Sequence, residues 1–289
     1  MRRIAAIATL AAALGAAAPA QAADPGLWTQ TGISTMPLYY YQGVTSDPQN
    51  RLFFDGIDFG LYRTDSQLNE QARNDDVIPP DVHLREHYNH IGDLSWDPAE
   101  GGRVILPLEC YYPPAGNTCN TGSFGVADPE TLRWRYYVKL DPAYIAKAMW
   151  AETSPNGKLI WTSSGDDLLA YRASDVTPAN AAPGGPLLRP VRILRGAVPP
   201  AGITGATFYR NRLYTAGAQG DLFQVWSTDL DTGAQRLEIE KTVVGESEGL
   251  DVAPVLGGVL HWQIQPYNEQ GPPTYGIANG TLLHFVPAK

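Results

Sequence analysis

The 289-residue sequence predicts an all-β fold, a single β-propeller, on three observations. Its 24 prolines and 29 glycines are spread along the whole chain, which disfavours long helices. Its 15 tyrosines and 7 tryptophans favour strands. Short apolar strands, each followed by a tight turn and a second strand, also recur along the chain, and this hairpin repeat is typical of propeller blades.

The spacing of the repeat gives the number of blades. Its copies begin near residues 42, 91, 149, 203 and 247, as in "MWAETSPNGKLIWTSS" and "ESEGLDVAPVLGGVLHWQ". An interval of roughly 50 residues matches a blade of four strands, so five blades fill the chain. Six blades remain an alternative if "LLRPVRILRGAV", residues 187–198, belongs to an additional, degenerate blade.

The segments between and before the blades complete this prediction. The stretch "LWTQTGIS", residues 27–34, is expected to add a strand to the last blade and so close the ring. The helix-like piece "DPAYIAKAMWAE", residues 141–152, has Asp141 as a possible helix cap and predicts at most a short connector. We place Glu238 on an outer strand.

The first 22 residues have the pattern of a secretory signal peptide. They begin with Arg2 and Arg3, continue through an apolar core, and end in Ala20-Gln21-Ala22, a small-x-small cleavage pattern. The apolar core is too short for a membrane anchor. We therefore expect a secreted protein, extracellular or periplasmic, with residues 23–289 as one propeller domain.

The chain has two cysteines, Cys110 and Cys119, within the turn-rich segment "ECYYPPAGNTCNTG". In an oxidising compartment two cysteines this close in sequence are expected to form a disulfide. Metal ligation is the alternative use, although neither a C-x-x-C pair nor a second cysteine pair accompanies them.

Charge and motifs exclude several classes of function. The formal net charge of −9 and the absence of a Lys/Arg cluster argue against nucleic acid and anionic membranes as partners. The sequence contains no G-x-S-x-G, Walker, dinucleotide or Asp-box motif, which disfavours serine hydrolases, nucleotide-binding loops and sialidases. We expect a monomer.

The segment "DVHLREHYNHIGD", residues 81–93, contains three of the five histidines, among them His87 and His90. Its H-x-x-E-H string matches an inverzincin peptidase signature, but that signature requires a helix inside a large α/β domain and a distal glutamate. Here Pro79 and Pro80 precede the string, and an inner strand follows it. We therefore interpret it as a loop or a single helical turn that leads to the central channel, with His90 and Asp93 at its mouth.

The string "SEGLDVAP", in which Glu248 precedes Gly249, resembles an inner strand of SMP-30/gluconolactonase and strictosidine-synthase-like propellers. It is also similar to the matching strand of calcium-activated nucleotidases, which have five blades. In these families an acidic residue at this place points into the channel and helps to hold calcium. The resemblance implies that Glu248 does so here, with Gln42 at the equivalent place in the first blade.

Physical chemistry favours a cation independently of this resemblance. The inner strands of a propeller converge on its axis, so Asp93, Glu152 and Glu248 are expected to lie close together, where a cation would neutralise them. Carboxylate and amide oxygens, including that of Gln42, suit calcium; zinc or manganese become candidates if His90 is also a ligand. The alternative is that these carboxylates pair with basic residues and only join blades.

Two functions therefore remain open. The first is a metal-dependent hydrolase of a small ester, lactone or phosphoester, in which the cation polarises the substrate and His90 or Asp93 moves the proton. The second is a non-catalytic propeller that binds a glycan, a peptide or a protein. In either case His87, Trp150 and Trp262, together with Tyr267, are candidate ligand-binding residues at the channel mouth; the alternative for the aromatic residues is packing between blades.

Overall fold

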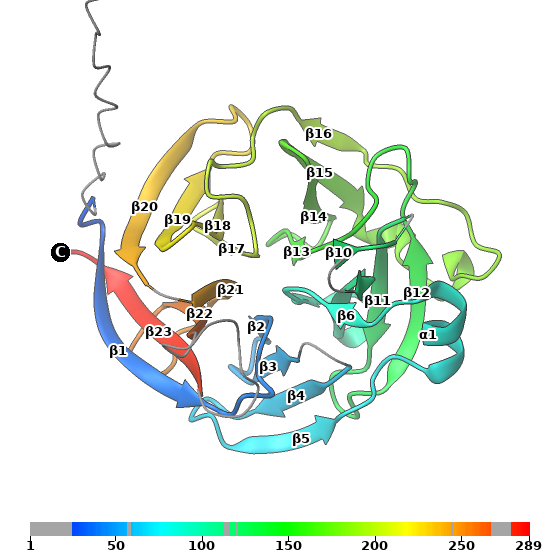
Figure 1. Ribbon diagram of the computed structural model, residues 1–289, viewed down its shortest axis with the longest axis horizontal. Coiled ribbons are helices and arrows are strands. Elements are labelled where there is room, and N and C mark those ends of the chain that lie inside the picture. Colours follow the sequence, from blue (N-terminus) through cyan, green and yellow to red (C-terminus); the bar gives the residue numbers. More distant parts are fainter. Residues whose placement is uncertain (1–24, 57–58, 113–115, 120, 244, 267–278) are drawn as a thin grey trace, which may run out of the picture.

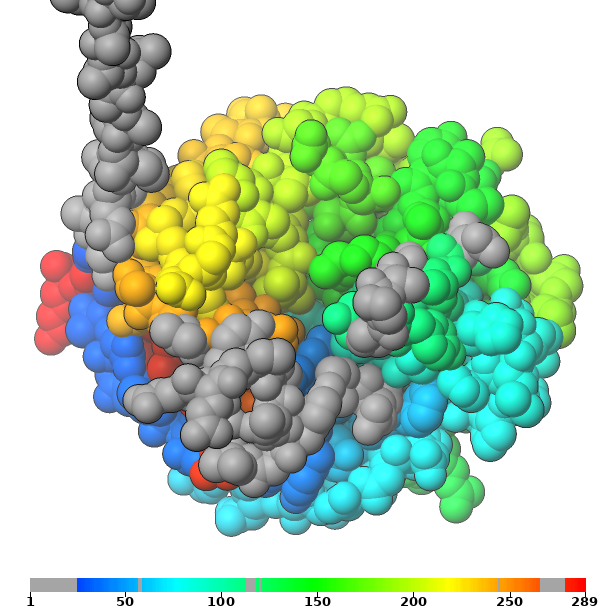
Figure 2. Space-filling model, in the orientation of Figure 1, coloured from blue at the N-terminus to red at the C-terminus, as the bar shows by residue number. Residues whose placement is uncertain are grey.

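The computed structural model describes residues 25–56, 59–112, 116–119, 121–243, 245–266 and 279–289. The predicted signal peptide lies outside these residues, as does Tyr267. Five antiparallel sheets surround a central axis and form a five-bladed β-propeller (Figure 1), which confirms the predicted fold. In a space-filling view the blades follow one another around the ring in chain order (Figure 2).

Within the first four blades the strands run in chain order from the axis outward, and in the fifth blade β1, from the start of the chain, is the outermost strand. The first blade consists of β2 (Val44–Ser46), β3 (Leu52–Asp55), β4 (Leu61–Thr64) and β5 (Glu70–Asn74), and the second of β6 (His90–Ile91), β7 (Ser95–Asp97), β8 (Arg103–Glu109), β11 (Ser123–Ala127) and β12 (Trp134–Lys139). The third consists of β13 (Glu152–Thr153), β14 (Leu159–Ser164), β15 (Asp167–Arg172) and β16 (Arg192–Leu194), and the fourth of β17 (Gly205–Tyr209), β18 (Arg212–Gln219), β19 (Leu222–Thr228) and β20 (Gln235–Thr242). The fifth consists of β21 (Gly245–Val252), β22 (Leu260–Pro266), β23 (Gly280–Pro287) and β1 (Trp28–Met36).

The remaining elements are short. They are a hairpin of β9 (Tyr111–Tyr112) and β10 (Gly116–Asn117), the helix α1 (Pro80–Glu86), and three 3₁₀ turns, η1 (Ala99–Gly101), η2 (Ala173–Asp175) and η3 (Pro178–Asn180). No helix among the described residues is long and apolar enough to cross a membrane.

The N-terminal strand closes the ring, as predicted. β1 pairs with β23 over the register from Trp28↔Pro287 to Met36↔Gly280, so the outermost strand of the last blade comes from the start of the chain. A β-bulge between Gln30 and Gly32 reverses which side chains face each side of the sheet. Trp28 therefore packs against the fourth blade, whereas Met36 packs in a cluster with residues of the first blade.

The alternative of six blades is wrong. The segment that suggested an extra blade forms β16, which pairs with β15 as the outer strand of the third blade. The predicted starts of the inner strands agree with β2, β6, β13, β17 and β21 to within a few residues. The segment 141–152 contains no helix: it is a turn in which Asp141 accepts a hydrogen bond from the N–H of Ala143 at 3.0 Å.

Apolar side chains fill the spaces between blades. Phe223 of the fourth blade and Trp262 of the fifth, for example, lie 5.9 Å apart between ring centroids and are fully buried. Burial of aromatic and aliphatic side chains on both faces of every sheet is the main stabilising contribution in such a fold.

At the axis, glycines allow the inner strands to approach closely. A Cβ atom at Gly249 would lie 2.5 Å from the backbone nitrogen of Val44, and one at Gly205 would lie 2.5 Å from the carbonyl oxygen of Glu248. Any side chain at these two positions would therefore push adjacent blades apart. This close approach determines how the acidic residues of the inner strands meet one another.

Candidate functional site

Asp93 lies at the centre of the propeller, between β6 and β7. Its carboxylate accepts hydrogen bonds from the N–H of Val44 in the first blade, at 3.0 Å, and of Ala206 in the fourth, at 2.8 Å. The N–H of Leu250 in the fifth blade donates a further bond. Burial raises the pKa of Asp93, and the three N–H donors partly offset that rise. Asp93 thus joins three blades to its own.

Three further buried carboxyl groups lie close to Asp93. Glu152 accepts hydrogen bonds from the hydroxyl of Ser95, at 3.0 Å, and from the N–H of Phe208, at 3.2 Å. The second carboxylate oxygens of Asp55 and Asp251 are buried without a hydrogen-bond partner in the described structure. Burial raises the pKa of all three groups, that of Asp251 to about 6.

The contacts of these carboxyl groups bear on the predicted cation site. Asp93 and Glu152 lie close together, and the charge of Asp93 adds to the rise in the pKa of both Glu152 and Glu248. Their oxygens, however, accept bonds from backbone N–H groups and a hydroxyl. Within the described ranges, no group of three or more His, Cys, Asp or Glu side chains is arranged to hold a metal ion. Calcium therefore stays a prediction, as do zinc and manganese.

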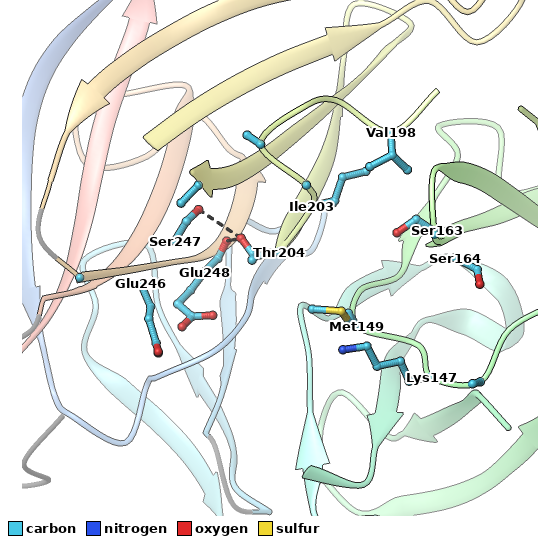
Figure 3. A pocket seen from close by; sticks show the side chains of 16 residues that line it. Lys147, Met149, Ser163, Ser164, Val198, Ile203, Thr204, Glu246, Ser247 and Glu248 are labelled. Atoms are coloured by element: carbon cyan, nitrogen blue, oxygen red, sulfur yellow. Dashed lines mark hydrogen bonds between the residues drawn. The ribbon is translucent and has the colours of Figure 1, made fainter. Parts of the chain in front are cut away.

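A cavity of about 740 Å³ opens beside the axis, where the third, fourth and fifth blades meet. Its walls come from the connectors 146–149 and 198–204 and from the ends of β14 and β21. Figure 3 shows Lys147 and Met149 on one side of it and Glu246 and Glu248 on the other. A volume of this size admits a small molecule.

The two glutamates of β21 form a carboxyl pair on the cavity wall. Glu246 and Glu248 lie two residues apart on the same strand, and their side chains are side by side in Figure 3. The hydroxyl of Tyr41 donates to Glu246 at 3.2 Å. Burial raises the pKa of Glu248 well above its usual range, and the charge and hydrogen bonding of Glu246 raise it further. The contact with Glu246 therefore favours the protonated form of Glu248.

Lys147 connects the cavity to a second group of polar side chains. Its ammonium lies 3.7 Å from the carboxylate of Glu109, whose pKa is raised by burial to about 7. Glu109 pairs in register with His90, and the His90 Nε2 lies 2.9 Å from the amide oxygen of Gln42. Burial lowers the pKa of His90 to about 4, and Lys147 adds to this effect, so the imidazole is neutral.

The predicted ligand-binding residues occupy different places. Trp150 and Trp262 are fully buried, and their indole N–H groups donate to the hydroxyls of Ser163, at 2.8 Å, and Ser247, at 3.1 Å. Both serines line the cavity, so the buried tryptophans hold two side chains of the cavity wall in position. His87 is an exposed residue at the C-terminus of α1, where its carbonyl accepts a bond from the hydroxyl of Tyr112 at 3.1 Å.

The helix α1 carries the peptidase-like string and binds other parts of the second blade. Glu86 pairs with Lys139 at 2.6 Å and accepts a bond from Tyr137 at 2.7 Å, while the His83 ring bonds to the carbonyl of Tyr88.

The predicted disulfide between Cys110 and Cys119 is formed, next to the hairpin of β9 and β10.

Sequence reasoning missed several residues of the site, namely Tyr41, Asp55, Glu109, Lys147, Glu246 and Asp251. Only Glu246 carried a signal, because alternation along a strand places it on the same face as Glu248. Lys147 lies in an irregular connector, which has no periodicity from which the direction of its side chain could be predicted.

Comparison with known proteins shows similarity of fold only. No protein-family model matches the chain, and no curated protein matches it. Among solved structures, it is similar to the glutaminyl cyclase of Myxococcus xanthus, with a TM-score of 0.53 and 11% identity over 91% of this chain and 97% of that one. It is also similar to a putative glucose dehydrogenase of Thermus thermophilus, with a TM-score of 0.50 and 11% identity over 88% of this chain and all of that one.

Proposed function

We propose that this protein is an exported enzyme that uses the carboxyl pair of Glu246 and Glu248 for general acid–base catalysis at the carbonyl group of a small polar substrate. The observation that carries the proposal is this pair on the wall of a 740 Å³ cavity, with Lys147 on the opposite side. The disulfide and the N-terminal sequence support an oxidising, exported location.

The pair supplies the two proton transfers that acyl transfer requires. One carboxyl group without its proton accepts a proton from the attacking nucleophile, and its protonated neighbour donates one to the leaving group. The raised pKa of Glu248 makes it the donor in the resting state. Lys147 stabilises the negative charge that develops on the carbonyl oxygen.

The charges in the cavity narrow the substrate class. Two neighbouring carboxyl groups repel a phosphate dianion, and the single charge of Lys147, which also has Glu109 as a partner, does not balance two negative charges on a substrate. Esters, lactones and amides are therefore favoured over phosphoesters. Among amides we include glutaminyl peptides in the proposed substrate class, because a glutaminyl cyclase has a similar fold.

The test is a substrate panel with matched variants. Purified mature protein is assayed on small esters, lactones, glutaminyl peptides and phosphoesters, with Glu248→Gln, Glu246→Gln and Asp231→Asn in parallel. Asp231 has a 95% exposed side chain in a turn and serves as the control. We expect both glutamate variants to lower kcat/KM by about 10²-fold or more and the control to match the wild type.

Two results would overturn the proposal. If Glu248→Gln and Glu246→Gln keep wild-type turnover, the pair is not the acid–base group. If no substrate of the panel is turned over but glycans or peptides bind, the non-catalytic alternative replaces it.

A further inference from the structure

A chain of hydrogen bonds crosses the fifth blade from its outermost strand β1, through β23 and β22, to the end of its inner strand β21 (Figure 1). The hydroxyl of Ser34 on β1 lies 2.7 Å from Nε2 of His284 on β23. Nδ1 of His284 lies 2.9 Å from Nδ1 of His261 on β22. Nε2 of His261 lies 2.8 Å from the carbonyl oxygen of Ala253. Three strands thus contribute one side chain each.

The chain has one consistent arrangement of protons. A carbonyl oxygen only accepts, so His261 carries its proton on Nε2. Its Nδ1 is then an acceptor, because burial lowers the pKa of this imidazole to about 4 and keeps it neutral. Nδ1 of His284 must therefore donate to it. Burial also lowers the pKa of His284, so its Nε2 is the remaining acceptor, and the hydroxyl of Ser34 donates to that nitrogen.

The surroundings provide space for this arrangement. His261 and His284 are almost completely buried, with 0% and 2% of their surface exposed. A Cβ atom at Gly32 would lie 3.3 Å from Cδ2 of His284, and one at Gly258 would lie 2.9 Å from Cβ of the same residue. Both glycines leave room for the two rings, whereas Ser34 remains partly exposed.

We propose that Ser34 is a nucleophile, activated by His284 and positioned through His261, that accepts acyl or sulfonyl groups from small activated compounds. The serine is hydrogen-bonded to a base, and the base is hydrogen-bonded to a group that orients it. This arrangement lowers the free energy needed to remove the proton of the hydroxyl group. β1 is also the edge strand of its sheet, so alternate N–H groups beside Ser34 point away from the sheet and can bind an oxyanion.

The reaction balances without a co-reactant other than water. The oxygen of Ser34 forms a bond to the carbonyl carbon of an ester, and its proton moves to Nε2 of His284. The bond to the leaving alcohol breaks, and the alcohol departs with that proton. Water then hydrolyses the acyl-serine and releases the acid. With a sulfonyl fluoride, fluoride leaves and the sulfonyl group remains on the oxygen.

This site is independent of the cavity of the proposed function. The two share no residue, and β1 is the outermost strand of the blade whose innermost strand carries Glu246 and Glu248. Loss of Ser34 reactivity would therefore leave turnover in the cavity unchanged.

Covalent labelling of the mature protein tests the proposal. The protein is treated with phenylmethylsulfonyl fluoride, and separately with 4-nitrophenyl acetate, and the adducts are located by peptide mass mapping. The internal control is Ser66, a serine of the same intermediate exposure in the turn after β4. We expect one adduct, on Ser34, formed about tenfold faster than any on Ser66. Ser34→Ala and His284→Gln should abolish it.

The opposite outcome is equally visible. If Ser34 in the wild-type protein reacts no faster than Ser66, the chain of hydrogen bonds is only a structural network and the proposal fails. This comparison uses the wild-type protein, so it holds even if His284→Gln does not fold. Ser34→Ala keeps both imidazoles, so persistence of the same adduct mass in that variant would also overturn it.

Discussion

Asp93 and Glu248 are both buried acidic residues at the inner strands, yet their surroundings differ. Three backbone N–H groups from three other blades donate to Asp93. Glu248 instead has a second carboxyl group, Glu246, as its neighbour, and its side chain lies on a cavity wall. Burial raises the pKa of both carboxyl groups.

The comparison shows that burial and a raised pKa do not by themselves mark a reactive carboxyl group. Asp93 has backbone donors on both oxygens, so it joins blades and has no oxygen left for a substrate. Glu248 is hydrogen-bonded to a second carboxyl group and lies beside open volume, so a substrate can reach it. The partners of each group decide which role it has.

The largest expected effect separates these two roles by stability. Asp93→Ala leaves three buried N–H groups without an acceptor, and each such group costs about 1–3 kcal/mol, so the free energy of unfolding should fall by about 3 kcal/mol or more. Glu248→Gln should change it by less than about 1 kcal/mol. Urea denaturation of both variants measures this. Equal losses in the two variants would contradict the comparison.

The pH dependence of stability tests a second axial carboxyl group. Burial raises the pKa of Asp251 from 3.8 to about 6, so the folded protein binds this proton more tightly than the unfolded chain does. Its contribution to stability is complete below pH 3.8 and is lost as the pH rises through about 6, with an upper limit of about 3 kcal/mol. Asp251→Asn should remove this loss.

The measurement is denaturation of the wild type and of Asp251→Asn at several pH values between 4 and 7, taken as a difference. The difference isolates Asp251 from His261, whose lowered pKa makes stability decrease in the opposite direction, as the pH falls from 6.5 towards about 4. A difference that does not vary with pH would show that Asp251 titrates normally in the folded protein.

The smallest expected effect concerns calcium. If the axial carboxyl groups bind calcium in the folded state only, calcium at about a hundred times its dissociation constant adds roughly 2.7 kcal/mol to the free energy of unfolding. Glu248→Gln should reduce this gain. The measurement is the melting temperature with calcium and with a chelator.

The control for that experiment follows from the structure. Glu238 is on an outer strand, as predicted, but it is buried and accepts bonds from Trp28 and Ser227, so its substitution would disturb the blade interface. Asp231→Asn is the better control because its side chain is exposed. An unchanged melting temperature in the wild type would rule out the cation site.

The sequence by itself determined the blades and the closure of the ring. The hairpin repeats roughly every 50 residues, and each repeat forms a sheet that is apolar on both faces. Packing of such sheets around an axis buries both faces of each sheet. The strand at residues 27–34 was predicted because the spacing of the repeat closes the ring with five blades. The disulfide was predicted because its two cysteines lie close together in the sequence of an exported protein. The positions of Asp93, Glu152 and Glu248 near the axis also follow from this pattern.

Only the tertiary structure decided what each of these carboxyl groups contacts. The donors to Asp93 are backbone N–H groups of Val44, Ala206 and Leu250, which carry no sequence signal because every residue except proline has one. The cavity is formed by irregular connectors, and the pairing of His261 with His284 depends on the register between β22 and β23. These contacts join positions far apart in the sequence, so they arise only when the blades close into a ring.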